Sequence, residues 1–213
     1  MNPEKRRIRE RGRRRGLILK ASRKLFLEKG FNQVTVSQIA QNAALSKGAI
    51  YLYFRSKEEI YAQILLNDIE KFHREVLLVF KEERSASEII ADFADFYVNF
   101  FLTDRELFRI LISFMLHTNN VGFTEEMNKR VIQETNKTIS IIERILRSGV
   151  ASGEFKLENE DIRRVRNVFW GLLNGIISLH LFVGKETKRE ERIRTNIKNG
   201  LDIFTEGLKS RAH

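Results

Sequence analysis

Several residue types are scarce in this chain of 213 residues, and each scarcity excludes a class of protein. Cysteine is absent, which excludes disulfide frameworks, thiol nucleophiles and cysteine-based zinc sites, and favours a reducing compartment. Proline occurs once and glycine 12 times, so few breakers interrupt a sequence rich in leucine, isoleucine, lysine, arginine and glutamate. This composition, with no alternating strand pattern, predicts an all-α protein of about nine helices.

Long apolar runs are absent as well. The longest, residues 169–183, is interrupted by Asn174 and His180 and is shorter than the roughly 20 residues that a membrane-spanning helix needs. Lys20 directly follows the short apolar run at residues 16–19, so no secretory signal is expected. We therefore expect a cytoplasmic protein without a transmembrane segment.

Residues for catalysis are also missing. The sequence has no glycine-rich phosphate loop and no His-Glu-x-x-His motif, and its four histidines are far apart in the chain. Paired acids such as Glu82-Glu83 lie at predicted helix ends, where solvated charges are common. We therefore expect a protein that is not an enzyme and that has no cofactor and no bound metal.

Positive charge is concentrated in the first quarter of the chain. Residues 1–60 carry 15 Lys and Arg against five Asp and Glu, whereas the remaining residues carry 23 of each kind. This asymmetry predicts a small module that binds a polyanion, either nucleic acid or an anionic membrane surface, joined to a larger neutral module. A merely solvated basic tail is the alternative.

Capping signals indicate where helices begin. A Ser or Thr followed three residues later by Glu or Gln lets two backbone donors be satisfied reciprocally. The pattern begins at five positions, namely Thr35, Ser56, Ser85, Thr103 and Thr187. Simpler caps are expected at Ser46, Thr124 and Asn159.

Three short helices are expected near the start, over about residues 14–29, 36–43 and 47–53. The last two are joined by the three-residue turn 44–46. Two short helices joined in this way inside a basic region indicate a helix-turn-helix, whose second helix enters the major groove of DNA.

Four segments of this region carry a specific pattern: LFLEKGF at 25–31, VTVSQIA at 34–40, AALSKGAIYLYF at 43–54 and SKEEI at 56–60. Together they closely resemble the DNA-binding domain of the TetR (tetracycline-repressor) family of bacterial transcriptional regulators. The one departure is Ala44, where the family usually has glycine, and alanine adopts a left-handed turn at modest cost. The resemblance divides the chain into a basic flexible arm (1–12), a helix-turn-helix domain (13–60) and a helical ligand-binding and dimerisation domain (61–213).

The resemblance also implies which residues contact DNA. Lys47 is placed to reach a guanine edge or a phosphate, and Gly48 and Ala49 let the backbone approach DNA closely. The other expected contacts are Arg13, Arg14, Arg15, Thr35, Ser37, Ser46, Tyr51, Tyr53 and Lys57. Helix capping is the alternative for the three hydroxyl residues, and a place in the core is the alternative for Tyr51.

The arm preceding residue 13 is more basic than a helix-turn-helix needs, and we expect it to be disordered without DNA. Such an arm either enters the adjacent minor groove, as homeodomain arms do, or attracts DNA without specificity.

Thirteen of the 16 phenylalanines follow residue 60. The resemblance implies a small-molecule pocket among the middle helices, and a phenylalanine-rich segment suits an apolar or aromatic effector. The residues expected to line the pocket are Phe93, Phe96, Tyr97, Phe100, Phe108, Phe114, His117 and Trp170. An ordinary aromatic core is the alternative.

The nearly apolar segment 169–179 and the apolar stripe of the last helix both need covering. The resemblance implies that the last two helices form a four-helix homodimer interface, with burial inside one chain as the alternative. We thus predict a sequence-specific regulator, a repressor that leaves a palindromic double-stranded operator when its effector binds. It would act in the bacterial cytoplasm, on the nucleoid when bound. A nonspecific architectural DNA-binding protein is the alternative.

Overall fold

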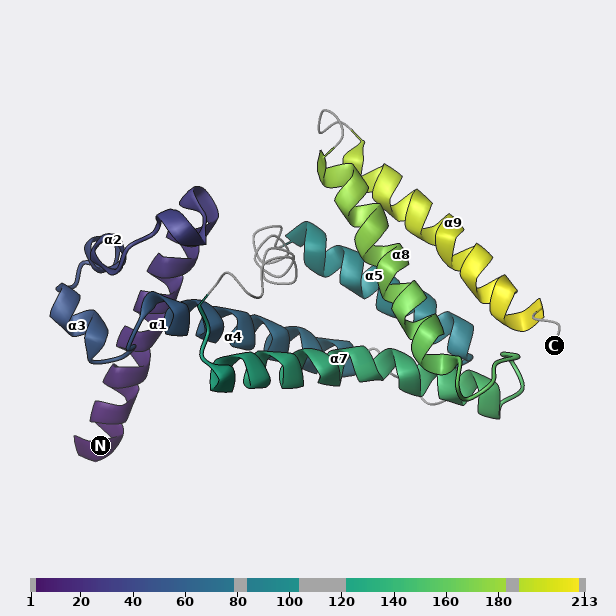
Figure 1. The fold of residues 1–213 in the computed structure, drawn as a ribbon, viewed down its shortest axis with the longest axis horizontal. Helices are drawn as coiled ribbons and strands as arrows, with labels where there is room; N and C mark the ends of the chain where they lie inside the picture. Colours follow the sequence, from purple (N-terminus) through teal and green to yellow (C-terminus); the bar gives the residue numbers. More distant parts are fainter. Residues whose placement is uncertain (1–2, 79–83, 104–121, 183–187, 211–213) are drawn as a thin grey trace. The chain divides into compact units, whose positions relative to one another are not determined.

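The computed structural model describes residues 3–78, 84–103, 122–182 and 188–210. This part of the chain holds eight α-helices, one short 3-10 helix and no strand (Figure 1), which confirms the all-α prediction. The elements are α1 (Pro3–Lys29), η1 (Phe31–Gln33), α2 (Val36–Asn42), α3 (Lys47–Tyr51), α4 (Lys57–Leu77), α5 (Ala86–Thr103), α7 (Glu125–Ala151), α8 (Ile162–Phe182) and α9 (Arg189–Ser210). The helix expected to begin near Thr103 lies outside the described residues.

Two compact units make up the chain. One contains residues 1–70 and 105–134, and the other contains residues 71–104 and 135–213. The core of the first unit joins α1, α2, α3 and the start of α4 through buried aliphatic and aromatic side chains. Its aromatic contacts centre on Tyr61, whose ring lies 5.2 Å from that of Phe26 and 4.9 Å from that of Phe31.

The first helix is longer than the sequence indicated. It begins at Pro3 rather than near Arg13, so residues 3–12 are helical here, which corrects the expectation of an irregular arm. Proline is well suited to the first turn of a helix. Glu10 accepts hydrogen bonds from Arg13 (2.9 and 3.0 Å) and Arg14 (2.9 Å), three and four residues further on, and these pairs relieve repulsion among the arginines.

Most of the expected caps are present in the described residues. Thr35 and Gln38 form a complete capping box at α2, and the Ser46 hydroxyl accepts a hydrogen bond from the Ala49 backbone N–H at α3. Asn159 is an exception, because its side chain accepts from Arg147 (3.0 Å) and α8 begins only at Ile162.

In the second unit, α9 packs against both α8 and α5. The loop after α7 ties the ends of three helices together. The Glu154 carboxylate accepts from the backbone N–H groups of Ala86 (2.7 Å) and Ser87 (3.0 Å), and the Lys156 N–H donates to the Leu208 carbonyl (2.8 Å). In the described residues, no helix has the length and apolar character that a bilayer crossing requires.

Candidate DNA interface and effector site

The helix-turn-helix is held in shape by its turn. Ala44 has a φ of 53°, so alanine does adopt the left-handed conformation that the sequence required at this position. The Leu45 N–H donates to the Ala40 carbonyl (2.9 Å), and Ile39 and Ile50 are fully buried between the helices. The turn and this small core fix the angle at which α3 is presented.

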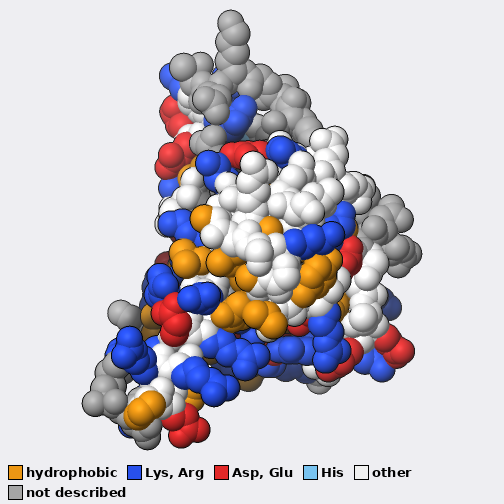
Figure 2. All heavy atoms as spheres, turned by 90° about the vertical axis from the view of Figure 1, so that its left-hand side faces the viewer, with side chains coloured by type: hydrophobic (Ala, Val, Ile, Leu, Met, Phe, Trp, Pro, Cys, Tyr) orange, Lys and Arg blue, Asp and Glu red, His pale blue; other side chains and the backbone are white. Residues whose placement is uncertain are grey.

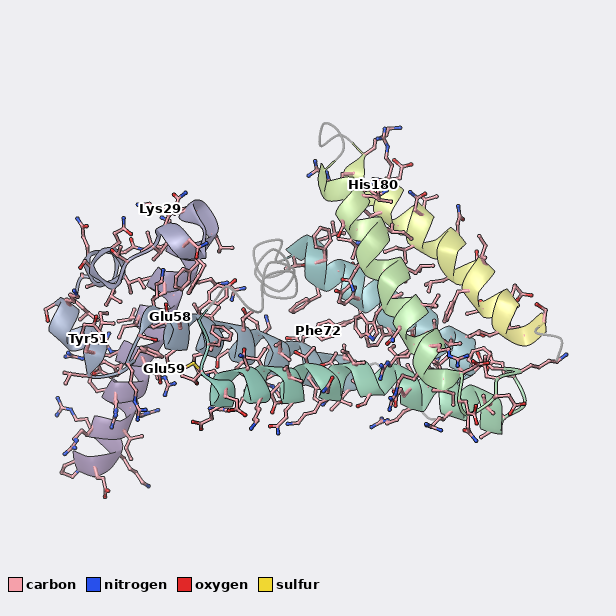
Figure 3. All side chains as sticks on the ribbon, viewed as in Figure 1. Lys29, Tyr51, Glu58, Glu59, Phe72 and His180 are labelled. Carbon is pink, nitrogen blue, oxygen red and sulfur yellow. The ribbon has the colours of Figure 1, made fainter. Side chains whose placement is uncertain are left out.

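One face of α3 is open to solvent. Lys47 and Gly48 are exposed, Ala49 is half-buried, and Tyr51 retains 48% of its surface while Phe54 behind it is buried. The labelled Tyr51 lies on α3 and not in the core (Figure 3). The position of Tyr51 agrees with an outward role for this side chain.

Lys47 is the one basic residue of α3, and the part of the chain that contains α3, residues 1–60, holds 15 Lys and Arg. Figure 2 shows Lys and Arg side chains gathered over the lower part of the face that it presents, around several hydrophobic side chains. Thr35 and Ser37, at the start of α2, are also exposed. The Thr35 hydroxyl accepts from the Gln38 N–H (3.3 Å), so it does cap the helix.

Several of the expected DNA contacts have partners inside the chain. The Lys57 ammonium donates to the carbonyls of Phe31 (3.1 Å) and Val34 (3.2 Å) and lies 4.4 Å from the centre of the Phe31 ring. The Arg15 guanidinium lies 4.9 Å from the Phe54 ring and donates to Gln63 (2.7 Å). Both side chains therefore hold the domain together.

In the second unit, aromatic rings from three helices meet. Phe72 of α4 is central: its ring lies 6.3 Å from Phe93, 5.4 Å from Phe96, 5.7 Å from Tyr97 and 4.8 Å from Phe100. Trp170 of α8 adds contacts to Phe93 (5.5 Å) and Tyr97 (5.4 Å). We call these residues the aromatic cluster, namely Phe72, Phe93, Phe96, Tyr97, Phe100, Phe169 and Trp170.

A few polar atoms lie within the aromatic cluster. The Tyr97 hydroxyl donates to Asn174 (2.7 Å), whose amide donates to the Trp170 carbonyl (2.9 Å). Burial raises the pKa of Tyr97 above its usual value of 10.0, so this hydroxyl stays protonated at neutral pH. The indole Nε1 of Trp170 is buried without a hydrogen-bond partner in the structure.

The structure brings together five of the eight residues expected at the effector site, because Phe108, Phe114 and His117 lie outside the described residues. It adds Phe72 and Asn174, which the sequence did not assign to the site. Phe72 was visible as part of the apolar face of its helix, and Asn174 as the polar break in an apolar run. His180, the other polar break in that run, lies near the end of α8 (Figure 3), and its Nε2 is 3.0 Å from the Asn196 amide of α9.

A stripe of small and apolar residues is exposed on α8 and α9. On α8, Val168 and Leu179 retain 57% and 65% of their surface, and Gly171 and Gly175 between them have open space where a Cβ would lie. On α9, Ile203 is 76% exposed. We call these five residues the α8–α9 stripe.

Comparison with known proteins agrees with this architecture. Residues 18–64 match the family model for bacterial regulatory proteins of the tetR family, and residues 105–210 match the model for the C-terminal region of QacR-like proteins.

The chain is 27% identical over 161 residues to a fatty acid metabolism regulator protein of Bacillus subtilis, covering 76% of this chain and 80% of that protein. It is 24% identical over 191 residues to the transcriptional regulator QacR of Staphylococcus aureus, covering 90% and 96%. The solved structure of the fatty acid degradation regulator FadR from Bacillus halodurans shares the fold, with a TM-score of 0.71, 19% identity and coverage of 92% and 97%.

The fold and the matches define a helix-turn-helix regulator. The chain belongs to the tetR family of bacterial regulatory proteins and is a DNA-binding transcriptional regulator.

Proposed function

We propose that this regulator is a homodimeric repressor that binds a roughly palindromic operator and leaves it when a small effector binds the second unit. The observation that supports the DNA-binding part of this proposal is the exposed face of α3. Lys47 offers a charge to a guanine edge or phosphate, and Tyr51 offers an exposed ring and hydroxyl.

Gly48 supports the same assignment. A Cβ at this position would meet only the Ser46 hydroxyl, at 3.9 Å, so the fold of the chain itself does not demand glycine here. Glycine would be favoured at this position if another molecule, such as the DNA backbone, approached it closely. Thr35, Ser37, Ser46, Ala49 and Tyr53 complete the proposed interface, with Arg13 and Arg14 beside it.

The proposed effector has an apolar body and at least one hydrogen-bond acceptor. The aromatic cluster provides apolar contact area, and the unpartnered Trp170 Nε1–H provides a donor inside it. Two similar proteins bear names that refer to fatty acid metabolism or degradation, which fits an apolar ligand. The DNA release follows if the effector binds the DNA-incompetent conformation more tightly.

The effector proposal is tested by screening fatty acids and aromatic carboxylic acids for release of operator DNA. Trp170→Phe keeps the ring packing but removes the donor. We expect this variant to bind the operator like the unmodified chain and to need roughly tenfold more effector for release. Equal release by both proteins would contradict the assigned role of Trp170.

The operator is best identified by selecting bound sequences from a random pool of DNA duplexes at ~0.15 M salt, where nonspecific attraction is partly screened. Recovery of a near-palindrome would support a specific dimeric regulator. Recovery of no motif, with binding that vanishes as salt rises, would support a nonspecific architectural protein instead.

Two substitutions on α3 test the recognition face with the selected operator. Lys47→Ala and Tyr51→Ala, made separately, should each weaken binding by about 1–3 kcal/mol, measured by fluorescence anisotropy. Leu77→Ala, an exposed apolar residue of α4, is a control expected to leave affinity unchanged. If both α3 variants keep affinity and sequence preference, α3 is not the reading helix.

A further inference from the structure

The N-terminal part of α1 is a basic helix with exposed side chains. Eight Lys and Arg precede Leu17, and residues 3–9 and 11–17 are all exposed. An α-helix with its side chains is about 10–12 Å across, whereas the minor groove of B-DNA is about 6 Å wide. The helical arm therefore does not fit into a minor groove as an extended arm would.

One side of this helix faces the end of α3. A hollow of about 680 Å³ lies between them, and its lining includes Arg6, Arg7, Arg11, Arg14, Leu52 and Tyr53. A second hollow of about 480 Å³ adjoins the same stretch of α1, and its lining is Pro3, Glu4, Arg7, Ile8 and Arg11. Lys5 and Arg9 line neither of these hollows. At 100° per residue they point away from Arg7 and Arg11.

The charge on the hollow side is only partly neutralised. Glu10 pairs with Arg13 and Arg14, and hydrogen bonds from these two guanidinium groups lower its pKa to about 2. In the described residues, Arg6, Arg7 and Arg11 have no ion pair. Three guanidinium groups on one side, next to the end of the recognition helix, suit the phosphates of a DNA backbone.

We propose that this part of α1 is a rigid, one-sided phosphate-binding element that holds the DNA flanking the sequence read by α3. Arg7 and Arg11 are its principal contacts, and Lys5 and Arg9 face away from the DNA. The proposal rests on the proposed operator binding and adds a surface to it. Its distinguishing feature is direction: charge on one side of the helix matters and equal charge on the other side does not.

Two matched double variants of the full chain test this direction. Arg7→Gln with Arg11→Gln removes two charges from the hollow side, and Lys5→Gln with Arg9→Gln removes two from the opposite side at the same spacing. Binding is measured by anisotropy from 50 to 300 mM salt. The duplexes carry the selected operator with and without 10 flanking base pairs on each side, and circular dichroism checks helix content.

For the long duplex, the first variant should lower the slope of log affinity against log salt by roughly 3.6, since the proposed dimer loses four phosphate contacts and each contributes about 0.9. It should bind at least tenfold more weakly at the lowest salt, and the second variant within threefold of the unmodified chain. For the short duplex, the two variants should differ little from each other.

Equal weakening by both variants would overturn the proposal in favour of undirected attraction, and no weakening by either would show that the helix does not contact DNA. If the first variant bound DNA as the unmodified chain does and lost only its binding to vesicles of anionic phospholipid, the surface would bind lipid and the proposal would be wrong. Failure of the unmodified chain to select any sequence would instead count against the proposed function.

Discussion

At the scale of single residues, substitutions of Thr35 can distinguish a helix cap from a DNA contact. Thr35→Ala removes the hydroxyl that accepts the Gln38 N–H, and loss of such a cap costs about 1 kcal/mol of unfolding free energy. Thr35→Ser retains a hydroxyl and should retain stability. Urea denaturation measures the difference. If the alanine variant keeps its stability and loses only operator affinity, the hydroxyl serves DNA and not the fold.

Gly149 of α7 is a position where the packing admits no side chain. A Cβ there would lie 2.2 Å from the Phe155 ring and 2.9 Å from the Ala86 Cβ. Gly149→Ala should lower the unfolding free energy by about 1–3 kcal/mol, because the neighbouring loop has to move.

The matched control for this substitution is Gly16→Ala in α1, where nothing lies within 4 Å of the added Cβ. Alanine favours a helix, so this variant should gain roughly 0.5–1 kcal/mol. Denaturant titrations at one protein concentration compare the two. A neutral Gly149→Ala would mean that Phe155 is free to shift.

Residue roles were readable from the sequence where they depend on near neighbours. The left-handed turn at Ala44, the cap at Ser46 and the outward Tyr51 follow from residues within one helical turn. The hydrogen bonds of the Lys57 ammonium could not be predicted in this way, because its carbonyl partners at Phe31 and Val34 lie more than 20 residues away in the chain.

At the scale of elements, Glu154 connects the loop after α7 to the start of α5. Its carboxylate accepts two backbone N–H groups that have no partner within α5. Burial alone would raise the pKa of Glu154. The nearby Ser87 hydroxyl, the hydrogen bonds from the backbone N–H groups of Ser87 and Ala86, and the charge of Lys209 bring it below the usual 4.5.

A pKa that is lower in the folded state means that the charged form stabilises the fold above pH 4.5 and that this contribution is lost as pH falls through the folded value. Glu154→Gln should therefore be less stable than the unmodified chain at pH 7. The difference should shrink as pH is lowered below about 4.5. Urea titrations from pH 7 to pH 3.5 measure it, and a difference that stays constant with pH would contradict the role of the charge.

Helix starts were predictable because caps are local, whereas the length of α1 was not. Runs of arginine indicate a solvated tail when read as charge alone. The structure shows that Glu10 lies at the right spacing to pair with Arg13 and Arg14 and so supports a helix. The spacing of three and four residues is visible in the sequence, but it brings Glu10 beside Arg13 and Arg14 only if the segment is helical.

At the scale of the whole molecule, the aromatic cluster was only partly predictable. The phenylalanines of α5 share one segment and were found together. Phe72 and Asn174 come from other helices, and the Tyr97–Asn174 hydrogen bond joins residues 77 positions apart. Periodicity shows that a residue is buried, but not which distant residues it meets.

The α8–α9 stripe leads to the last prediction, on assembly. Small and apolar residues at 168, 171, 175 and 179 lie on one side of α8, where their spacing lets a second helix approach closely. We expect Leu179→Glu to convert a dimer to a monomer in sedimentation experiments, because a charge would be buried in the interface between the two chains. Operator affinity should fall roughly a hundredfold or more, since two linked recognition helices become one.

Ile132→Glu is the matched control, because this exposed apolar side chain lies on α7, which contributes no residue to the stripe. It should leave both the mass in solution and operator affinity unchanged. Circular dichroism should show that both variants keep their helix content, since neither position is buried in the chain. A Leu179→Glu protein that stays dimeric and binds the operator tightly would place the dimer interface elsewhere, and the exposed face of α8 would then need another partner.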